Sequence, residues 1–309
     1  MEPLYNDYNA YLRRRFGCKV YRVGLDAGST CPNRDGTKGY GGCVYCNEKG
    51  SRSPYTDPAL TVREQLERGM RRLRQDKGAQ KFIAYFQAFS NTYGPVSRLK
   101  ELLDTAIAFP EIVGISVGTR PDTVDQKKMA VLASYTGRRE VWVEYGLQTI
   151  HDRTLELLNR RHSYEDFVQA VRLTKQYGLL SCAHVILGLP GEDRDDMIKT
   201  AQALSALGIN GVKIHLLHIL KGSMLEVLYC EGKVSLLSQE EYVRCAADFL
   251  EYLSPEIVIQ RLTGEGDPES HIAPEWARAK IETIERIKAE LEHRVTRQGG
   301  ALSGSSPAQ

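Results

Sequence analysis

The chain has 309 residues, with 41 lysines and arginines against 39 aspartates and glutamates, which gives a net charge of +2. Hydrophobic residues make up 42% of it and charged residues 26%, values that exclude a mainly disordered chain. No apolar run approaches the roughly 18 residues that a membrane span needs. The first residues lack the apolar segment of a secretory signal, so we expect a cytoplasmic protein without a membrane partner.

Short β-rich segments alternate with helical segments through the first two thirds of the chain. We expect strands at 19–26, 81–89, 111–117, 140–146, 180–187 and 211–219. Amphipathic helical patterns lie between them, and this order predicts a parallel sheet with helical crossovers. Roughly 200 residues are short for a barrel of eight units. The predicted fold class is therefore α/β, a partial (β/α)6 TIM-like barrel with a C-terminal helical extension.

The pattern changes after the sixth strand. Amphipathic helices at 239–253 and 277–291 flank a short apolar run at 257–262, which indicates a cap on the barrel. The sequence pattern therefore predicts three parts: a partial barrel at 1–222, an α/β cap at 223–293 and a disordered Gly/Ser-rich tail at 294–309.

Three of the seven cysteines lie in a glycine-rich loop that follows the first expected strand. They are Cys31, Cys43 and Cys46, at the end of the strand where barrel active sites are built. Cys43 and Cys46 share a tight turn, and the glycines between them and Cys31 allow the loop to fold back. We therefore expect the three thiols to converge as metal ligands.

The number and spacing of these cysteines distinguish between several kinds of metal centre. Structural zinc prefers four ligands, usually in two close pairs, but the first histidine is His151 and Cys18 precedes the strand. A thioredoxin-type pair explains neither Cys31 nor the glycines, and a four-cysteine electron-transfer cluster lacks a ligand. Three ligands suit a [4Fe–4S] cluster with one open iron, which can bind S-adenosylmethionine. Such a pair of cofactors generates a 5′-deoxyadenosyl radical for hydrogen abstraction.

The cysteine spacing also resembles that of a known family. Cys-x11-Cys-x2-Cys with Tyr45 inside it resembles the radical SAM superfamily, in the variant of the elongator catalytic subunit. Further motifs are TRPD at 119–122, EYGLQTIHDRTLELLNRRH at 144–162 and HVILGLPGE at 184–192. With them, nearly the whole chain is similar to the YhcC/YtqA-like radical SAM family. The resemblance implies an external one-electron donor of flavodoxin or ferredoxin type.

The resemblance also suggests roles for individual residues. Tyr45 occupies a position that abuts adenine, with simple loop packing as the alternative. The resemblance implies further cofactor contacts from polar side chains, namely Gln87, Asn91, Glu144, Gln148 and Arg160. It also implies a strand edge that faces adenine, formed by Ile186 and Gly188. Glu144 would be costly inside the barrel without a partner. His184 and His215 are the catalytic candidates, and each has a structural alternative as a core histidine.

The substrate class rests on charge clusters and on the resemblance. Basic residues gather at 13–15, 68–77, 138–139 and 160–161, as for contacts to a polyanion, although solvated faces explain them equally. The resemblance implies tRNA as partner and wobble uridine as target, with a carboxymethylaminomethyl side chain converted to aminomethyl. The alternatives are a radical enzyme acting on a small molecule or peptide, and a non-catalytic metal-binding protein that contacts nucleic acid.

Overall fold

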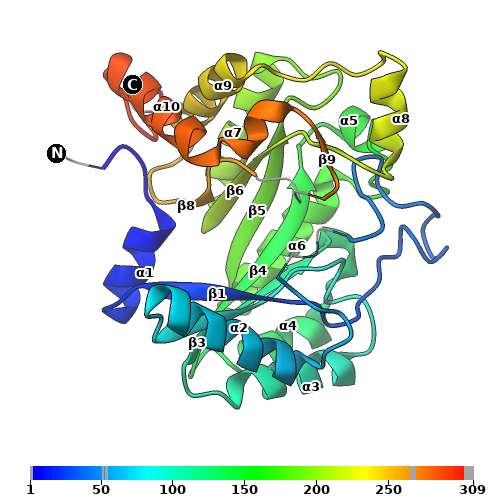
Figure 1. Ribbon diagram of the computed structural model, residues 1–309, viewed down its shortest axis with the longest axis vertical. Helices are drawn as coiled ribbons and strands as arrows, with labels where there is room; N and C mark the ends of the chain where they lie inside the picture. Colours follow the sequence, from blue (N-terminus) through cyan, green and yellow to red (C-terminus); the bar gives the residue numbers. More distant parts are fainter. Residues whose placement is uncertain (1–2, 51, 53–54, 265–268, 303–309) are drawn as a thin grey trace.

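A computed structural model describes residues 3–50, 52, 55–264 and 269–302 of the chain. Its main sheet has seven strands in the order β1-β2-β3-β4-β5-β6-β8, and every neighbouring pair is parallel. The sheet curls into a partial barrel, which confirms the predicted fold class (Figure 1). The strands of this sheet are β1 Val20–Leu25, β2 Lys81–Phe86, β3 Ile112–Thr119, β4 Glu140–Gln148, β5 Leu180–Leu187, β6 Gly211–Leu216 and β8 Val258–Arg261. β7 (Ile219–Leu220) and β9 (His271–Ala273) form a separate antiparallel pair.

Helices cover the outer face of the sheet, with α2, α3 and α4 over one part and α7, α9 and α10 over another (Figure 1). The helices are α1 Tyr8–Phe16, α2 Val62–Lys77, α3 Val96–Ile107, α4 Gln126–Ala133, α5 Asp152–Leu157, α6 Tyr164–Gln176, α7 Arg194–Leu207, α8 Met224–Cys230, α9 Gln239–Glu251 and α10 Lys280–His293. Two 3-10 turns cover Pro121–Thr123 and Glu275–Arg278. None of the helices within the described residues combines the length and the apolar character required to cross a bilayer.

The barrel contains one more strand than the sequence pattern suggested. The apolar run at 257–262 forms β8, which pairs with β6 from Gly211↔Val258 onward. Two helices, α8 and α9, separate β6 from β8, so the simple alternation of one strand and one helix is lost there. β8 therefore extends the partial barrel from within the segment that was predicted to be a cap, and the division at residue 222 stays a prediction.

The N-terminal segment closes the end of the barrel opposite the strand C-termini. Tyr8 and Leu12 of α1 pack with Trp142 of β4 in a buried cluster. The backbone N–H of Ile259 in β8 donates to the carbonyl of Asn6 over 2.8 Å. This aromatic plug of Tyr8, Leu12 and Trp142 fills the barrel at the N-terminal ends of the strands. The interior at the C-terminal ends of the strands is left for a cavity.

The segment after α10 is ordered over its first part. Gln298 is 4% exposed and donates to the carbonyls of Ser254 (2.7 Å) and Ile257 (2.8 Å). Its amide oxygen accepts from the backbone N–H of Asn6 over 2.9 Å. The prediction of disorder from residue 294 is therefore wrong for 294–302, because a buried amide pairs there with backbone carbonyls of the turn before β8, which composition alone does not reveal. Residues 303–309 lie outside the described residues.

Candidate active site

A cavity opens at the C-terminal ends of the strands, with about 940 Å³ of empty space that includes open solvent at its mouth. The loop after β1 brings all three predicted cysteines to its wall. Other predicted residues reach it from β4, β5, β6 and the loops beside them. These are Tyr45, Gln87, Glu144, Gln148, Arg160, His184 and His215. The strand expected to run to residue 89 ends at Phe86, so Gln87 lies in the loop above it.

The cysteine loop is held by backbone and amide hydrogen bonds. Cys46 N–H donates to the carbonyl of Cys43 over 2.9 Å, which makes the tight turn expected from the short spacing. Gly42 has a φ of 80°, a conformation that a side chain would strain, and its carbonyl accepts from Asn159 Nδ2 over 2.8 Å. Lys38, in the middle of the loop, forms an ion pair of 2.6 Å with Asp122. The segment between Cys31 and Cys43 is therefore folded back against the C-terminal ends of the central strands.

Arg160, which the resemblance implied as a cofactor contact, lies against Cys43 of the cysteine loop. Its Nη1 donates to Cys43 Sγ over 3.2 Å and to the hydroxyl of Tyr45 over 3.0 Å, and its Nη2 donates to the carbonyl of Gly146. Burial raises the pKa of the Cys43 thiol, but the neighbouring Arg160 charge and hydrogen bond outweigh it and lower that pKa. The thiolate form required of a metal ligand is therefore favoured at Cys43.

Glu144 has the partners that a buried acid needs. Its carboxylate accepts hydrogen bonds from Ser116 and Lys213 and, over 2.8 Å, from His184 Nε2. Burial would raise its pKa, but the charge of Lys213 and the hydrogen bond from His184 hold that pKa well below the usual range. Lys213 is itself 1% exposed and donates to the hydroxyl of Tyr85 over 3.0 Å. Glu144 is therefore an ionised carboxylate in the lining of the cavity.

The two candidate histidines lie beside this ion pair. Burial and the Lys213 charge lower the pKa of His184 to about 4, so its ring is neutral near pH 7. Its ring centroid is 5.4 Å from that of His215. His215 Nε2 is buried and has no hydrogen-bond partner. Both rings therefore offer nitrogen atoms at the cavity, although a catalytic role for either one stays a prediction.

Gln148 has a backbone conformation that supports its predicted role. It is a non-glycine residue with a φ of 79°, at the end of β4 where it lines the cavity. Strained residues of this kind persist where the surrounding structure holds them, and they cluster at functional sites. The strained backbone of Gln148 therefore marks the end of β4 as a candidate functional position, and its contact with the cofactor stays a prediction.

Three predicted cofactor residues do not line the cavity. Asn91 donates to the carbonyls of Ala88 (3.0 Å) and Gly118 (2.9 Å), so it joins the loops that follow β2 and β3. Ile186 belongs to a buried apolar cluster beside the cavity. Gly188 has a φ of 79°, and a Cβ there would lie 2.9 Å from the Leu237 side chain. Backbone geometry and packing therefore explain why this position is a glycine. Contacts from these residues to a cofactor stay predictions.

Several cavity residues carried no assigned role in the sequence analysis. They are mainly cationic or aromatic, namely Arg34, Tyr85, Phe89, Arg120 and Arg261. Arg120 lies in the TRPD motif at 119–122, which belongs to the resemblance. Its position directly after a buried strand is the signal that pointed to the cavity, since parallel strands gather such positions at one end.

The basic clusters do not form one surface around the cavity. Arg160 is buried beside Cys43, while Arg15 pairs with Glu140 at the start of β4, at the opposite end of the barrel. Arg68 and Arg74 of α2 pair with Asp57 and Glu111. Clustering along the sequence therefore provides little support for a nucleic-acid surface.

The partial barrel and the three cysteines at its open end agree with the protein family that the sequence matches. The sequence matches the radical SAM superfamily over residues 28–204 and the Radical_SAM C-terminal domain over residues 209–293. The chain belongs to the radical SAM superfamily and is a radical SAM enzyme. Within it, the chain belongs with the YhcC/YtqA-like proteins. The alternative of a non-catalytic metal-binding protein is therefore wrong.

Individual relatives support this membership. The chain is 43% identical to YtqA of Bacillus subtilis over 301 residues, which cover 96% of this chain and 92% of that one. It is 34% identical to YhcC of Escherichia coli over 304 residues, or 98% and 96% of the two chains. The fold is similar to Methanocaldococcus infernus Elp3, with a TM-score of 0.66, 18% identity and coverage of 90% and 64%. This last likeness shows the fold alone.

The cavity fits the cofactors of the superfamily, a [4Fe–4S] cluster and S-adenosylmethionine. Cys31, Cys43 and Cys46 are free thiols that share the cavity wall, which leaves one iron of a cubane without a cysteine ligand from this loop. Four arginines and one carboxylate, Glu144, are found among the described residues of the lining. Such an excess of positive charge suits anionic groups.

Proposed function

We propose that this enzyme converts the carboxymethylaminomethyl side chain of wobble uridine in tRNA to aminomethyl. The observation that carries the proposal is a relative whose name states a wobble-uridine reaction. The chain is 29% identical to the tRNA uridine(34) acetyltransferase of Methanocaldococcus jannaschii over 134 residues, or 42% of this chain and 24% of that one. An external donor of flavodoxin or ferredoxin type belongs to the same proposal.

The chemistry of that side chain explains the need for a radical enzyme. When bound, the cluster and S-adenosylmethionine supply a 5′-deoxyadenosyl radical that removes hydrogen from an unactivated carbon. Loss of a hydrogen atom from the carboxymethyl carbon leaves a carbon radical that the adjacent nitrogen stabilises. Transfer of one electron to an external iron–sulfur or flavin protein, with loss of a proton, gives an imine. Water then cleaves the imine to the aminomethyl group and glyoxylate.

The residues of the cavity suit such a polar side chain. Neutral His184 presents a ring whose Nε2 donates to Glu144, which leaves Nδ1 as an acceptor for an N–H group. The aromatic plug of α1 closes the opposite end of the barrel, so a substrate side chain enters from the cysteine end. The chain's residues thereby orient the substrate side chain from this one end.

The test uses protein reconstituted without oxygen, S-adenosylmethionine, a reduced flavodoxin and tRNA that carries the carboxymethylaminomethyl group. We expect aminomethyluridine, glyoxylate and 5′-deoxyadenosine, measured by mass spectrometry. A Cys43→Ala variant and tRNA with unmodified wobble uridine are the controls. If 5′-deoxyadenosine forms while the tRNA nucleosides stay unchanged, the proposal is wrong and a small-molecule or peptide substrate is favoured.

A further inference from the structure

Arg120 is a buried cation at the cavity with one donor unused. It follows β3, is 3% exposed and contributes to the cavity lining. Its Nε and Nη2 donate to the two carboxylate oxygens of Asp122 over 2.8 and 2.9 Å, and Nη2 also donates to the carbonyl of Arg160 over 2.7 Å. Its Nη1 is buried and has no hydrogen-bond partner. A buried donor on a charged group is costly to leave unpaired, so a missing partner is expected.

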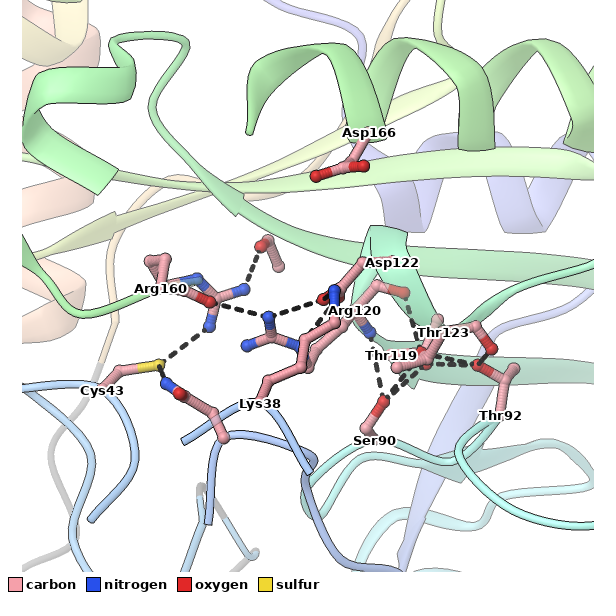
Figure 2. A network of polar contacts seen from close by, with 12 residues as sticks. Lys38, Cys43, Ser90, Thr92, Thr119, Arg120, Asp122, Thr123, Arg160 and Asp166 are labelled. Atoms are coloured by element: carbon pink, nitrogen blue, oxygen red, sulfur yellow. Dashed lines mark hydrogen bonds and ion pairs between the residues drawn. The ribbon is translucent and has the colours of Figure 1, made fainter. Parts of the chain in front are cut away.

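The surroundings of Nη1 define the chemistry of that partner. Figure 2 shows the guanidinium of Arg120 between Asp122 and the pair formed by Arg160 and Cys43. Asp122 already accepts from Lys38 as well, so two cations share this single carboxylate. The Arg160 guanidinium lies on the other side, directed at Cys43. An additional anion is therefore favoured at Nη1 by both hydrogen bonding and charge.

We propose that Arg120 binds a carboxylate in this cavity through Nη1. Asp122 and the carbonyl of Arg160 fix the plane of the guanidinium, so Nη1 is oriented before the ligand arrives. Charge-assisted hydrogen bonds of this kind are short and directional. The carboxylate belongs either to S-adenosylmethionine or to the carboxymethyl group of the substrate; the second source rests on the proposed function.

The first arm of the test concerns S-adenosylmethionine. Binding of S-adenosylmethionine and of its decarboxylated analogue is measured by equilibrium dialysis on reconstituted wild type and on Arg120→Gln. If the cofactor provides the carboxylate, the substitution weakens binding of S-adenosylmethionine about tenfold or more and leaves binding of the analogue unchanged.

The second arm concerns the substrate. Affinities are measured, with S-adenosylmethionine present, for tRNA that carries carboxymethylaminomethyl or aminomethyl at the wobble uridine. If the substrate provides the carboxylate, wild type prefers the first tRNA and Arg120→Gln loses that preference. Wild type that distinguishes neither tRNA contradicts the proposed function, while the first arm still decides the role of Arg120.

Controls separate binding from folding. Arg138→Gln removes an exposed arginine in the turn just before β4, at the far end of the barrel, and should change neither ratio. If Arg120→Gln fails to retain iron, Arg120→Lys replaces it, because lysine keeps the charge but loses the planar donor pair. A folded, iron-loaded Arg120 variant that keeps the wild-type ratio in both arms overturns the proposal.

Discussion

Nη1 of Arg160 lies 3.2 Å from the sulfur of Cys43, although the two residues are 117 positions apart in the chain. The contact joins the loop that follows α5 to the cysteine loop that follows β1. The same nitrogen donates to Tyr45, and Nη2 donates to the carbonyl of Gly146 at the end of β4. One buried arginine thereby links three segments of the cavity wall.

Arg160→Gln is expected to reduce the iron content after reconstitution and to weaken S-adenosylmethionine binding. The shorter amide loses the charge and the hydrogen bonds to Cys43 and Gly146, so the cysteine loop is less well fixed. Iron analysis and equilibrium dialysis measure the two effects. Arg138→Gln serves as the control, and full iron loading in Arg160→Gln at wild-type cofactor affinity would contradict the prediction.

Cysteine substitutions should divide into two groups. Cys31→Ala, Cys43→Ala and Cys46→Ala should each abolish the visible iron–sulfur absorbance and formation of 5′-deoxyadenosine, because each removes one of the three predicted cluster ligands. Cys230→Ala and Cys245→Ala should retain both, since Cys230 is exposed on α8 and Cys245 lies on α9, away from the cavity lining. Loss of the cluster in either control would mean that the ligand set is incomplete.

The Glu144–Lys213 ion pair should contribute to stability as a unit. Glu144→Gln or Lys213→Met alone leaves one buried charge without its partner and should lower the free energy of unfolding by about 3–5 kcal/mol. The double variant should be less destabilised than the sum of the two single variants. Urea denaturation of the four proteins without cofactors gives the coupling energy, and strict additivity would rule out the pairing.

Asp122 should make stability depend on pH in the acid range. Burial would raise its pKa, but hydrogen bonds and charges from Arg120 and Lys38 lower it to about 2 from 3.8. A folded-state pKa below the unfolded value stabilises the protein above about pH 4, and this contribution disappears as the pH falls towards 2. The shift corresponds to about 2 kcal/mol.

The measurement compares wild type with Asp122→Asn in urea at several pH values. The difference in unfolding free energy should be largest near pH 6 and should shrink below pH 4. A difference that stays constant across this range would show that the carboxylate charge is not responsible.

Local patterns in the sequence were sufficient to predict the fold class and the convergence of Cys31, Cys43 and Cys46 on one cavity. Buried strands and amphipathic helices carry their own periodicity, and Cys43 and Cys46 are close in the chain. β8 was missed as a barrel strand because it is short and follows two helices, so its place depends on pairing with β6. Gln298 was assigned to a disordered tail because its hydrogen bonds are made by residues far away in the chain.

Sequence alone determined that three cysteines would gather at the C-terminal end of the first strand, since loop position and cysteine spacing are local properties. Only the tertiary structure decided how charge is arranged around them. It paired Glu144 with Lys213, placed Arg160 on Cys43 and left one donor of Arg120 without a partner. These residues come from strands and loops that are far apart in the chain. The energies of their interactions depend on burial and distance, which the spacing of residues along the sequence does not specify.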